Sequence, residues 1–377
     1  MSDSVLLFPS SVYADRLDRA TEIIHQQGLS GMIIGTGAEF AYLTGSWVST
    51  HERFTALVLS ADGPASIIIP EVDAGDLQQS AVPDLDINII GWSDGDNAHL
   101  LAAQQFHSDG PVALGSSLTT AHVLALQNLL APRQFQLASR ILSGLFGTKD
   151  DAELEQLSGA AQAIDEVHAQ VPQLLQPGRT EEEVAKDIEK LILEKHSAVD
   201  FIIVGSGPHG ANPHHSFSQR VLEVGDPVVV DIGGTFGPGY HSDCTRTYVV
   251  GGVDAIAQAP AEFRDYYQIL YRAQEEACQA VRPGIPASTI DNIARSIITD
   301  AGYGEAFFHR TGHGIGLSTH EEPNISADND LILAPGMCFS VEPGIYLSGQ
   351  HGARIEDIMV VTEDGGRRLN NQPRELR

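Results

Sequence analysis

The C-terminal half of this 377-residue chain carries four acidic residues and one histidine that together could hold metal ions. They are Asp231, Asp243, His313, Glu342 and Glu356. Four carboxylates in one pocket would repel each other and raise one another's pKa unless cations neutralised them. Carboxylates with one imidazole and no thiolate suit Mn, Fe, Co or Zn ions. Two such ions can share carboxylates, activate water and polarise a carbonyl group, which is what hydrolysis of an amide bond requires.

The first two acidic residues lie in a predicted β-hairpin. β-branched residues run directly into Asp231, and a second run of this kind, residues 245–250, follows Asp243. The stretch 233–239 between them is rich in glycine and therefore typical of a turn. Taken singly, an acidic residue at a strand end is most often a turn former or a helix cap, so the prediction of a metal site rests on the whole set.

The last acidic ligand has to be chosen between two neighbours. If residues 354–358 form a strand, side chains alternate, so Arg354 and Glu356 share one face while Asp357 points to the other. Glu356 lies beside a positive partner and is therefore preferred. His313 stands among three glycines, which indicates backbone that approaches another group closely.

An internal duplication relates the segments that carry these residues. Pro-Gly motifs that open helical patterns recur 106 residues apart, and the same offset pairs His214 with His320. An offset of 111 residues pairs Asp231 with Glu342. A pseudo-two-fold axis is therefore expected to bring the two histidines, and the two acidic residues, to opposite sides of one site.

Four stretches of this region resemble a known family. They are Gly-Tyr-His-Ser-Asp-Cys-Thr-Arg-Thr, His-Arg-Thr-Gly-His-Gly-Ile-Gly-Leu, Ser-Val-Glu-Pro-Gly-Ile-Tyr and Ala-Arg-Ile-Glu-Asp. They look like the pita-bread metallopeptidases, specifically the branch of prolidase (Xaa-Pro dipeptidase) and aminopeptidase P. Residues 13–70 look like the N-terminal domain of that branch. The resemblance implies an α+β fold, with a C-terminal pita-bread domain preceded by a smaller, creatinase-N-like α/β domain.

The resemblance also implies roles for individual residues. Its dinuclear site, with two divalent ions per subunit, is ligated at the positions of Asp231, Asp243, His313, Glu342 and Glu356. Mn²⁺ is the expected metal, with Co²⁺ or Zn²⁺ as alternatives. His214 and His320 match two histidines that the family places beside the scissile carbonyl. Arg354 and Tyr346 match positions that support the ligands.

The expected reaction is hydrolysis of the Xaa-Pro bond of dipeptides by a hydroxide that two metal ions activate. Glu342 is expected to act both as a ligand and as a proton shuttle to the leaving proline nitrogen. His214 and His320 would hydrogen-bond the substrate, and Arg354 would orient a ligand carboxylate.

One departure from the family pattern bears on the substrate. Asn324 stands where some strict dipeptidases of the family carry a basic residue that holds the C-terminal carboxylate of the substrate. The sequence therefore leaves open an Xaa-Pro aminopeptidase (aminopeptidase P) that acts on longer peptides. A pita-bread protein that only binds its ligand is a more distant alternative, and the complete set of five ligands argues against it.

Length and charge set the frame around the site. A chain of 377 residues exceeds the size of about 250–300 residues at which a single core stops growing. We therefore expect an N-terminal domain, 1–146, for assembly and substrate restriction, and a catalytic domain, 147–377. The net charge of −28 argues against a nucleic-acid partner.

Location and assembly are also predicted. No apolar stretch reaches the roughly 18 residues of a membrane span, so no membrane association is expected. Three cysteines without close pairing predict a reducing cytoplasm. In relatives, the loop corresponding to that of Trp47 can reach a partner's active site. The resemblance thus implies a homodimer in which Trp47 and Arg53 restrict access for long peptides.

Overall fold

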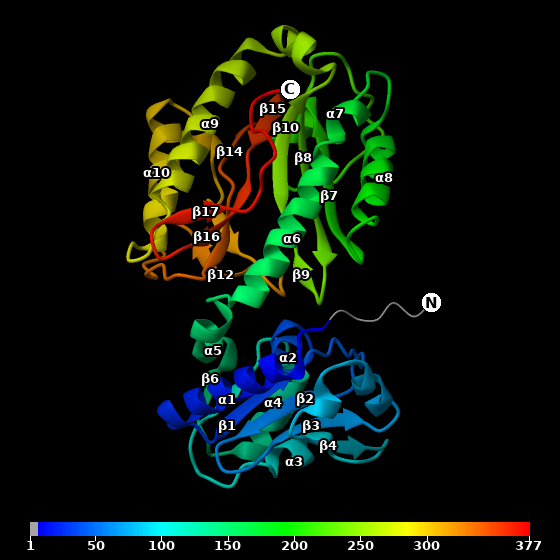
Figure 1. Ribbon diagram of the computed structural model, residues 1–377, viewed down its shortest axis with the longest axis vertical. Helices are drawn as coiled ribbons and strands as arrows, with labels where there is room; N and C mark the ends of the chain where they lie inside the picture. The colour runs from blue at the N-terminus through cyan, green and yellow to red at the C-terminus, as the bar shows by residue number, and fades with distance from the viewer. Residues whose placement is uncertain (1–6) are drawn as a thin grey trace. The chain divides into compact units, whose positions relative to one another are not determined.

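The computed structural model describes residues 7–377 and divides into two compact units, one ending at Phe146 and the other beginning at Gly147 (Figure 1). Each unit has its own sheet or sheets and its own hydrophobic core. No helix within residues 7–377 is long and apolar enough to cross a membrane.

The N-terminal unit is built on one mixed six-stranded sheet. Its order is β4–β3–β2–β1–β5–β6, with β1 antiparallel to β2 and parallel to β5. The strands are β1 (Gly31–Gly35), β2 (Ala56–Ser60), β3 (Ala65–Pro70), β4 (Ile87–Trp92), β5 (Val112–Leu114) and β6 (Phe135–Leu137). The helices are α1 (Ser10–Gln26), α2 (Ala38–Thr44), α3 (Ala98–Ala103), α4 (Thr120–Leu130) and α5 (Ala138–Phe146), with the short 3₁₀-helices η1 (Ala74–Gln79) and η2 (Val82–Asp84).

The C-terminal unit combines long helices with several small antiparallel sheets. Its helices are α6 (Asp151–His168), α7 (Val171–Leu174), α8 (Glu181–Ile192), α9 (Ala261–Ala280) and α10 (Ala287–Asp300), with 3₁₀-helices η3 (Gly207–Ala211), η4 (Gly252–Gln258) and η5 (Gly304–Ala306). Its strands are β7 (Ala198–Ser206), β8 (Pro227–Phe236), β9 (Tyr240–His241), β10 (Cys244–Val249), β11 (Gly312–Gly314), β12 (Glu321–Ile325), β13 (Cys338–Val341), β14 (Gly344–Leu347), β15 (His351–Arg354), β16 (Asp357–Val361) and β17 (Gly366–Arg368).

Two similar halves make up this unit. In the first half, β8 pairs with β7 and β10, and a core of buried apolar residues joins these strands to α6 and α8. In the second half, β13 pairs with β11 and β16, and a separate core joins them to α9 and α10. α8 and the pair α9–α10 lie on opposite sides of the strands (Figure 1). Each half thus supplies helices and an antiparallel strand pair, as the duplication predicts.

Local sequence signals explain where the helices of the first half begin. The side chain of Asp150 accepts a hydrogen bond from the backbone of Glu153, whose own side chain accepts one from the Asp150 backbone. Thr180 and Glu183 make the same reciprocal pair at the start of α8. These capping boxes satisfy backbone N–H groups that have no partner within the helix.

The predicted hairpin forms, but its turn is shorter than expected. β8 continues through Phe236, so the turn is confined to residues 237–239, where Gly237 and Gly239 have φ values of +54° and +115°. Gly233 lies in the strand because close packing requires a glycine there. A Cβ at that position would lie 2.5 Å from the ring of Phe201.

The single strand expected over residues 354–358 does not form, because β15 ends at Arg354 and β16 begins at Asp357. Glu342 follows the end of β13 and precedes Pro343, which has no backbone N–H to donate to a strand ladder. Glu356 lies between β15 and β16. Both carboxylates therefore stand at strand ends, where the chain changes direction.

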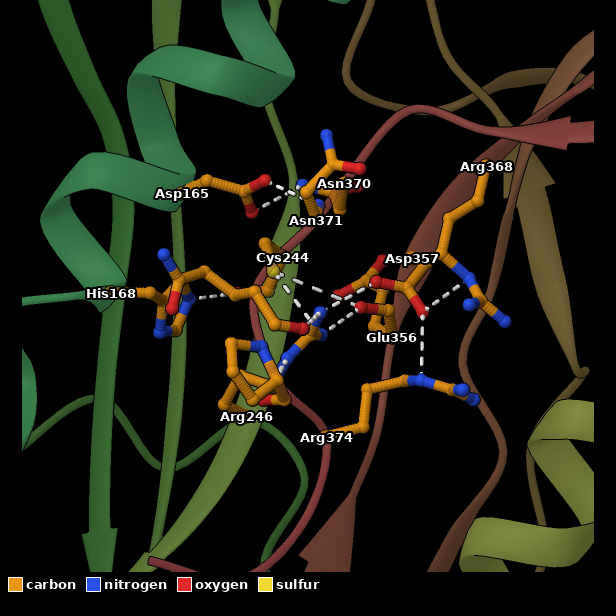
Figure 2. Close-up of polar contacts among 12 residues, drawn as sticks. Asp165, His168, Cys244, Arg246, Glu356, Asp357, Arg368, Asn370, Asn371 and Arg374 are labelled. Carbon is orange, nitrogen blue, oxygen red and sulfur yellow. Dashed lines mark hydrogen bonds and ion pairs between the residues drawn. The ribbon is translucent and has the colours of Figure 1, made fainter.

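Asp357 lies at the junction of the two halves rather than at the site. Its Oδ1 accepts a hydrogen bond of 2.6 Å from Arg246 Nη2 on β10, and its Oδ2 accepts one of 2.9 Å from Gln274 Nε2 on α9. Arg368 Nε is 3.0 Å from Oδ2, and Arg374 also faces this carboxylate (Figure 2). Because Asp357 is fully buried, its charge has to be compensated by these neighbours.

Replacing Asp357 with Asn should strongly destabilise the C-terminal unit. The change leaves the buried Arg246 guanidinium without its counter-charge, a loss of about 3–5 kcal/mol. For a unit of this size, the melting temperature should fall by about 6–20 °C. Differential scanning calorimetry with a chelator present measures this without a contribution from metal binding. The exposed Asp364→Asn change is the control, and an equal effect of both changes would contradict the assignment.

Candidate active site

The acidic residues and the histidines gather at a cavity in the C-terminal unit. The cavity has a volume of about 1000 Å³ and is open to solvent on one side. Asp231, Asp243, His313 and Glu342 line it. Asp231 lies on β8 and Asp243 directly precedes β10. His313 lies on β11 and Glu342 directly follows β13. The two halves of the unit therefore both contribute to one site.

Four of the five predicted ligands lie close together. One side-chain atom from each of Asp243, His313 and Glu356 lies within 4.8 Å of the other two. Nε2 of His313 is 3.2 Å from Oε1 of Glu342 and 3.7 Å from Oδ2 of Asp243. Glu356 is behind the cavity wall and is only 1% exposed.

Arg354 connects the fifth predicted ligand to this group. Its Nη2 donates a 2.5 Å hydrogen bond to Oδ2 of Asp231, and its Nε lies 3.9 Å from Oε2 of Glu342. Nη1 donates to the hydroxyl of Tyr346 at 2.8 Å, and Nε donates to Oγ1 of Thr245 at 3.0 Å. Arg354 thus holds Asp231 in place. Tyr346 contacts Arg354 and does not line the cavity.

The carboxylates are buried without enough positive charge around them. Burial raises the pKa of Asp243 well above its usual value, and the charges of Glu356, Asp231 and Glu342 raise it further. Burial, followed by Glu342 and Asp231, likewise raises the pKa of Glu356. Burial also favours a higher pKa for Glu342, but hydrogen bonding to His313 and nearby positive charges lower it to about 2.

Two carboxylate oxygens of this cluster also lack hydrogen-bond partners. Within the described part of the chain, no group donates to Oδ1 of Asp231 or to Oε1 of Glu356, although both atoms are buried. Such an oxygen is unfavourable unless something replaces the water it has lost. Divalent cations would supply both the missing contacts and the missing charge. The residues therefore fit a pair of metal ions, and four carboxylates with one imidazole suit Mn²⁺, Co²⁺ or Zn²⁺.

His214 and His320 both line the cavity. The ring of His320 lies 4.0 Å, centroid to centroid, from that of His313. Burial, and then the charges of His313 and Arg310, lower the pKa of His320 to about 4. A histidine with this pKa is neutral at neutral pH, so it can donate a hydrogen bond to a carbonyl oxygen without carrying charge.

His209 and His215, the two other histidines near His214 in the sequence, belong to a second cluster around Glu181. His209 Nδ1 and His215 Nε2 lie 3.0 Å and 2.9 Å from carboxylate oxygens of Glu181. The backbone and hydroxyl groups of Ser206, together with the Ser218 hydroxyl, also donate to this carboxylate. These hydrogen bonds account for the cluster and fasten the loop around His214, which itself faces the cavity.

Sequence reasoning gave no role to two further cavity residues, His309 and Arg310. Nε2 of His309 is 3.0 Å from the Tyr346 hydroxyl, and burial lowers the pKa of His309. The available signal was their position directly before the glycine-rich stretch that contains His313.

The two residues proposed to restrict the substrate lie in the N-terminal unit. Trp47 follows α2 in a segment without regular structure, and its side chain is 43% exposed. Nη2 of Arg53 is 3.2 Å from Oδ1 of Asp94. Among the described residues, those that line the cavity lie between Phe201 and Arg354. The restricting role of Trp47 and Arg53 stays a prediction.

Comparison with known protein families decides the family. The model of metallopeptidase family M24 matches residues 155–363, and that of the creatinase/prolidase N-terminal domain matches residues 16–145. The chain belongs to metallopeptidase family M24. It is therefore a peptidase, and the predictions of an α+β pita-bread fold and of the prolidase branch are confirmed.

Relatives of this M24 peptidase match it over nearly their whole length. The probable dipeptidase PepE of Mycobacterium tuberculosis is 49% identical over 98% of this chain and 97% of its own. The crystal structure of dipeptidase PepE from Mycobacterium ulcerans has a TM-score of 0.93 at 49% identity, covering 98% of both chains. The structure of a prolidase from Thermococcus sibiricus has a TM-score of 0.88 at 36% identity, covering 97% of this chain and 98% of the other.

Replacing Asp243 with Asn should change stability in opposite directions with and without metal. In metal-free protein, the neutral amide relieves repulsion among buried carboxylates, so the melting temperature should rise. The direction follows from the raised pKa of Asp243, whose charged form is unfavourable beside Glu356, Asp231 and Glu342. With saturating Mn²⁺, the variant should melt below wild type because a ligand is lost. Calorimetry in the presence of a chelator and, separately, of Mn²⁺ measures the two melting temperatures of each protein. A variant less stable than wild type in both conditions would contradict this account.

Proposed function

We propose that this M24 peptidase is a metal-dependent dipeptidase that hydrolyses the Xaa-Pro bond. The observation that carries the proposal is the cluster of buried, under-compensated carboxylates beside a cavity that also holds His214 and His320. The names of the relatives, dipeptidase and prolidase, support the proposed substrate class.

Asp231, Asp243, His313, Glu342 and Glu356 would hold two divalent cations, with Mn²⁺ proposed and Co²⁺ or Zn²⁺ as alternatives. When bound, the cations would supply the Lewis acidity that activates water and polarises the scissile carbonyl. The chain's own contribution is to keep the ligands apart and oriented. Arg354 does so for Asp231, and the hydroxyls of Thr245 and Ser340 donate to Glu356 and Glu342 at 2.8 Å and 3.0 Å.

The remaining groups would act on the substrate. His320 and His214 would donate hydrogen bonds to the scissile carbonyl oxygen or to the substrate backbone, where negative charge develops during attack. Cleavage of the C–N bond leaves the bonding electron pair on the proline nitrogen, so the departing amine has to receive a proton. Glu342 faces both the ligand cluster and the cavity, and it is our proposed carrier of that proton.

One observation favours a second candidate, an aminopeptidase P that acts on longer peptides. Asn324 is neutral at the position where some strict dipeptidases of the family have a basic residue. We also propose a homodimer in which Trp47 and Arg53 limit the length of the peptide. A binding protein without catalysis is disfavoured because all five proposed ligand positions hold carboxylate or imidazole side chains, the types of group that coordinate metal.

The substrate class is tested by one assay on Mn²⁺-loaded protein. We expect cleavage of an Xaa-Pro dipeptide and little cleavage of the corresponding Xaa-Pro-Xaa tripeptide or of a dipeptide without proline. Released amino acids are quantified by chromatography. Preferred cleavage of the tripeptide would instead establish aminopeptidase P, and failure to cleave any of the three would refute the proposed peptidase specificity.

Replacing His320 with Ala should slow turnover without loss of metal. Removing one donor to a developing oxyanion lowers kcat about 100- to 1000-fold. Steady-state kinetics and elemental analysis of the same sample separate the two effects. His25→Ala, an exposed change on α1, should leave both values unchanged. If His320→Ala lost metal while turnover per bound ion stayed at the wild-type value, the proposed role of His320 would be wrong.

A further inference from the structure

The cavity holds two guanidinium groups, those of Arg354 and Arg310, among the described residues that line it. They differ in whether a carboxylate forms an ion pair with them. Arg354 is buried and bonded to Asp231 and Tyr346, so its charge belongs to the ligand cluster. Arg310 is half-buried, and within residues 7–377 no carboxylate oxygen forms an ion pair with it. Arg310 therefore brings an uncompensated positive charge to the cavity wall.

Arg310 is held in place by a neutral partner. Its Nη1 donates a hydrogen bond to Oδ1 of Asn324. Asn324 is itself fixed by Glu322, whose carboxylate accepts hydrogen bonds from the backbone and side-chain nitrogens of Asn324 at 2.9 Å and 2.8 Å. The amide orients the guanidinium but does not neutralise it. A guanidinium has five N–H donors in a planar fork, so donors remain for an anion in the cavity.

The position of Arg310 relates it to the reacting bond. Arg310 is three residues before His313, and its charge is one of the causes that lower the pKa of His320. Arg310 and His320, the histidine proposed to contact the scissile carbonyl, both line the cavity. Phe217 and Phe308, which are 40% and 63% exposed, line the same cavity and offer apolar surface for a proline ring.

The geometry points to Arg310 as the residue that binds the C-terminal carboxylate of the substrate, an inference that rests on the proposed Xaa-Pro peptidase. In a dipeptide, that carboxylate is two bonds from the scissile nitrogen, so its oxygens lie about 3–5 Å from the carbonyl carbon under attack. In a longer peptide, a neutral amide takes this place and forms no ion pair. Arg310 would thus favour dipeptides and supply the positive charge that Asn324 lacks.

The test compares an Xaa-Pro dipeptide with its C-terminal amide, which has nearly the same shape but no negative charge. Wild-type protein should favour the dipeptide by about 10- to 100-fold in kcat/KM. Arg310→Met should lower kcat/KM for the dipeptide by that factor, mainly through KM, and leave the amide unchanged. Arg310→Lys should keep part of the preference. Asn324→Asp, which places a carboxylate against the guanidinium, should remove it as Arg310→Met does.

Arg282→Met, a change at an exposed arginine outside the cavity, is the matched control, and metal content is measured for every variant. An Arg310→Met variant that keeps the wild-type preference, or that loses both substrates equally with its metal content intact, would overturn the role of Arg310 alone. Calorimetric binding of proline and prolinamide tests the same contact without turnover. Wild-type protein that neither cleaves the dipeptide nor binds proline would overturn the proposed function together with this inference.

Discussion

The main physical constraint on this structure is that several negative charges are buried in one place, which is energetically unfavourable. Asp231, Asp243, Glu342 and Glu356 are held at strands and strand ends from both halves of the C-terminal unit, and within the described chain Arg354 is the one guanidinium that contacts their carboxylate groups. Burial and mutual repulsion make this arrangement unfavourable by itself. Divalent cations would remove that cost. The same repulsion between carboxylates that destabilises the metal-free protein therefore favours metal binding.

Much of the surrounding structure holds these charges in position. Arg246, Arg368 and Arg374 face Asp357, which directly follows Glu356, so the junction between the two halves is electrically compensated. Glu181 fastens the loop that carries His214 through hydrogen bonds to His209 and His215. The compensated Asp357 lies away from the cavity, whereas the under-compensated carboxylates line the cavity or, for Glu356, lie behind its wall. That division separates the residues that stabilise the fold from those proposed to bind metal and substrate.

The gathering of these acidic residues and His313 at one site, and the duplication, could be predicted because both follow from residue type and spacing in the sequence. The choice of Glu356 over Asp357 also followed from side-chain alternation, although Arg354 and Asp357 belong to different strands. The length of β8 was misjudged because Gly233 and Gly234 are required by close packing, which the sequence does not display. His309 and Arg310 were missed for a similar reason: their roles depend on Tyr346 and Asn324, which approach them only in the folded chain.

The central claim is that the carboxylates and His313 together hold two cations. It is tested most directly by anomalous X-ray diffraction at the manganese absorption edge, on crystals of the protein grown with Mn²⁺. The account predicts two anomalous peaks about 3.5–4 Å apart, both in contact with this cluster. A map without a peak there, or with bound ions only elsewhere on the protein, would contradict it.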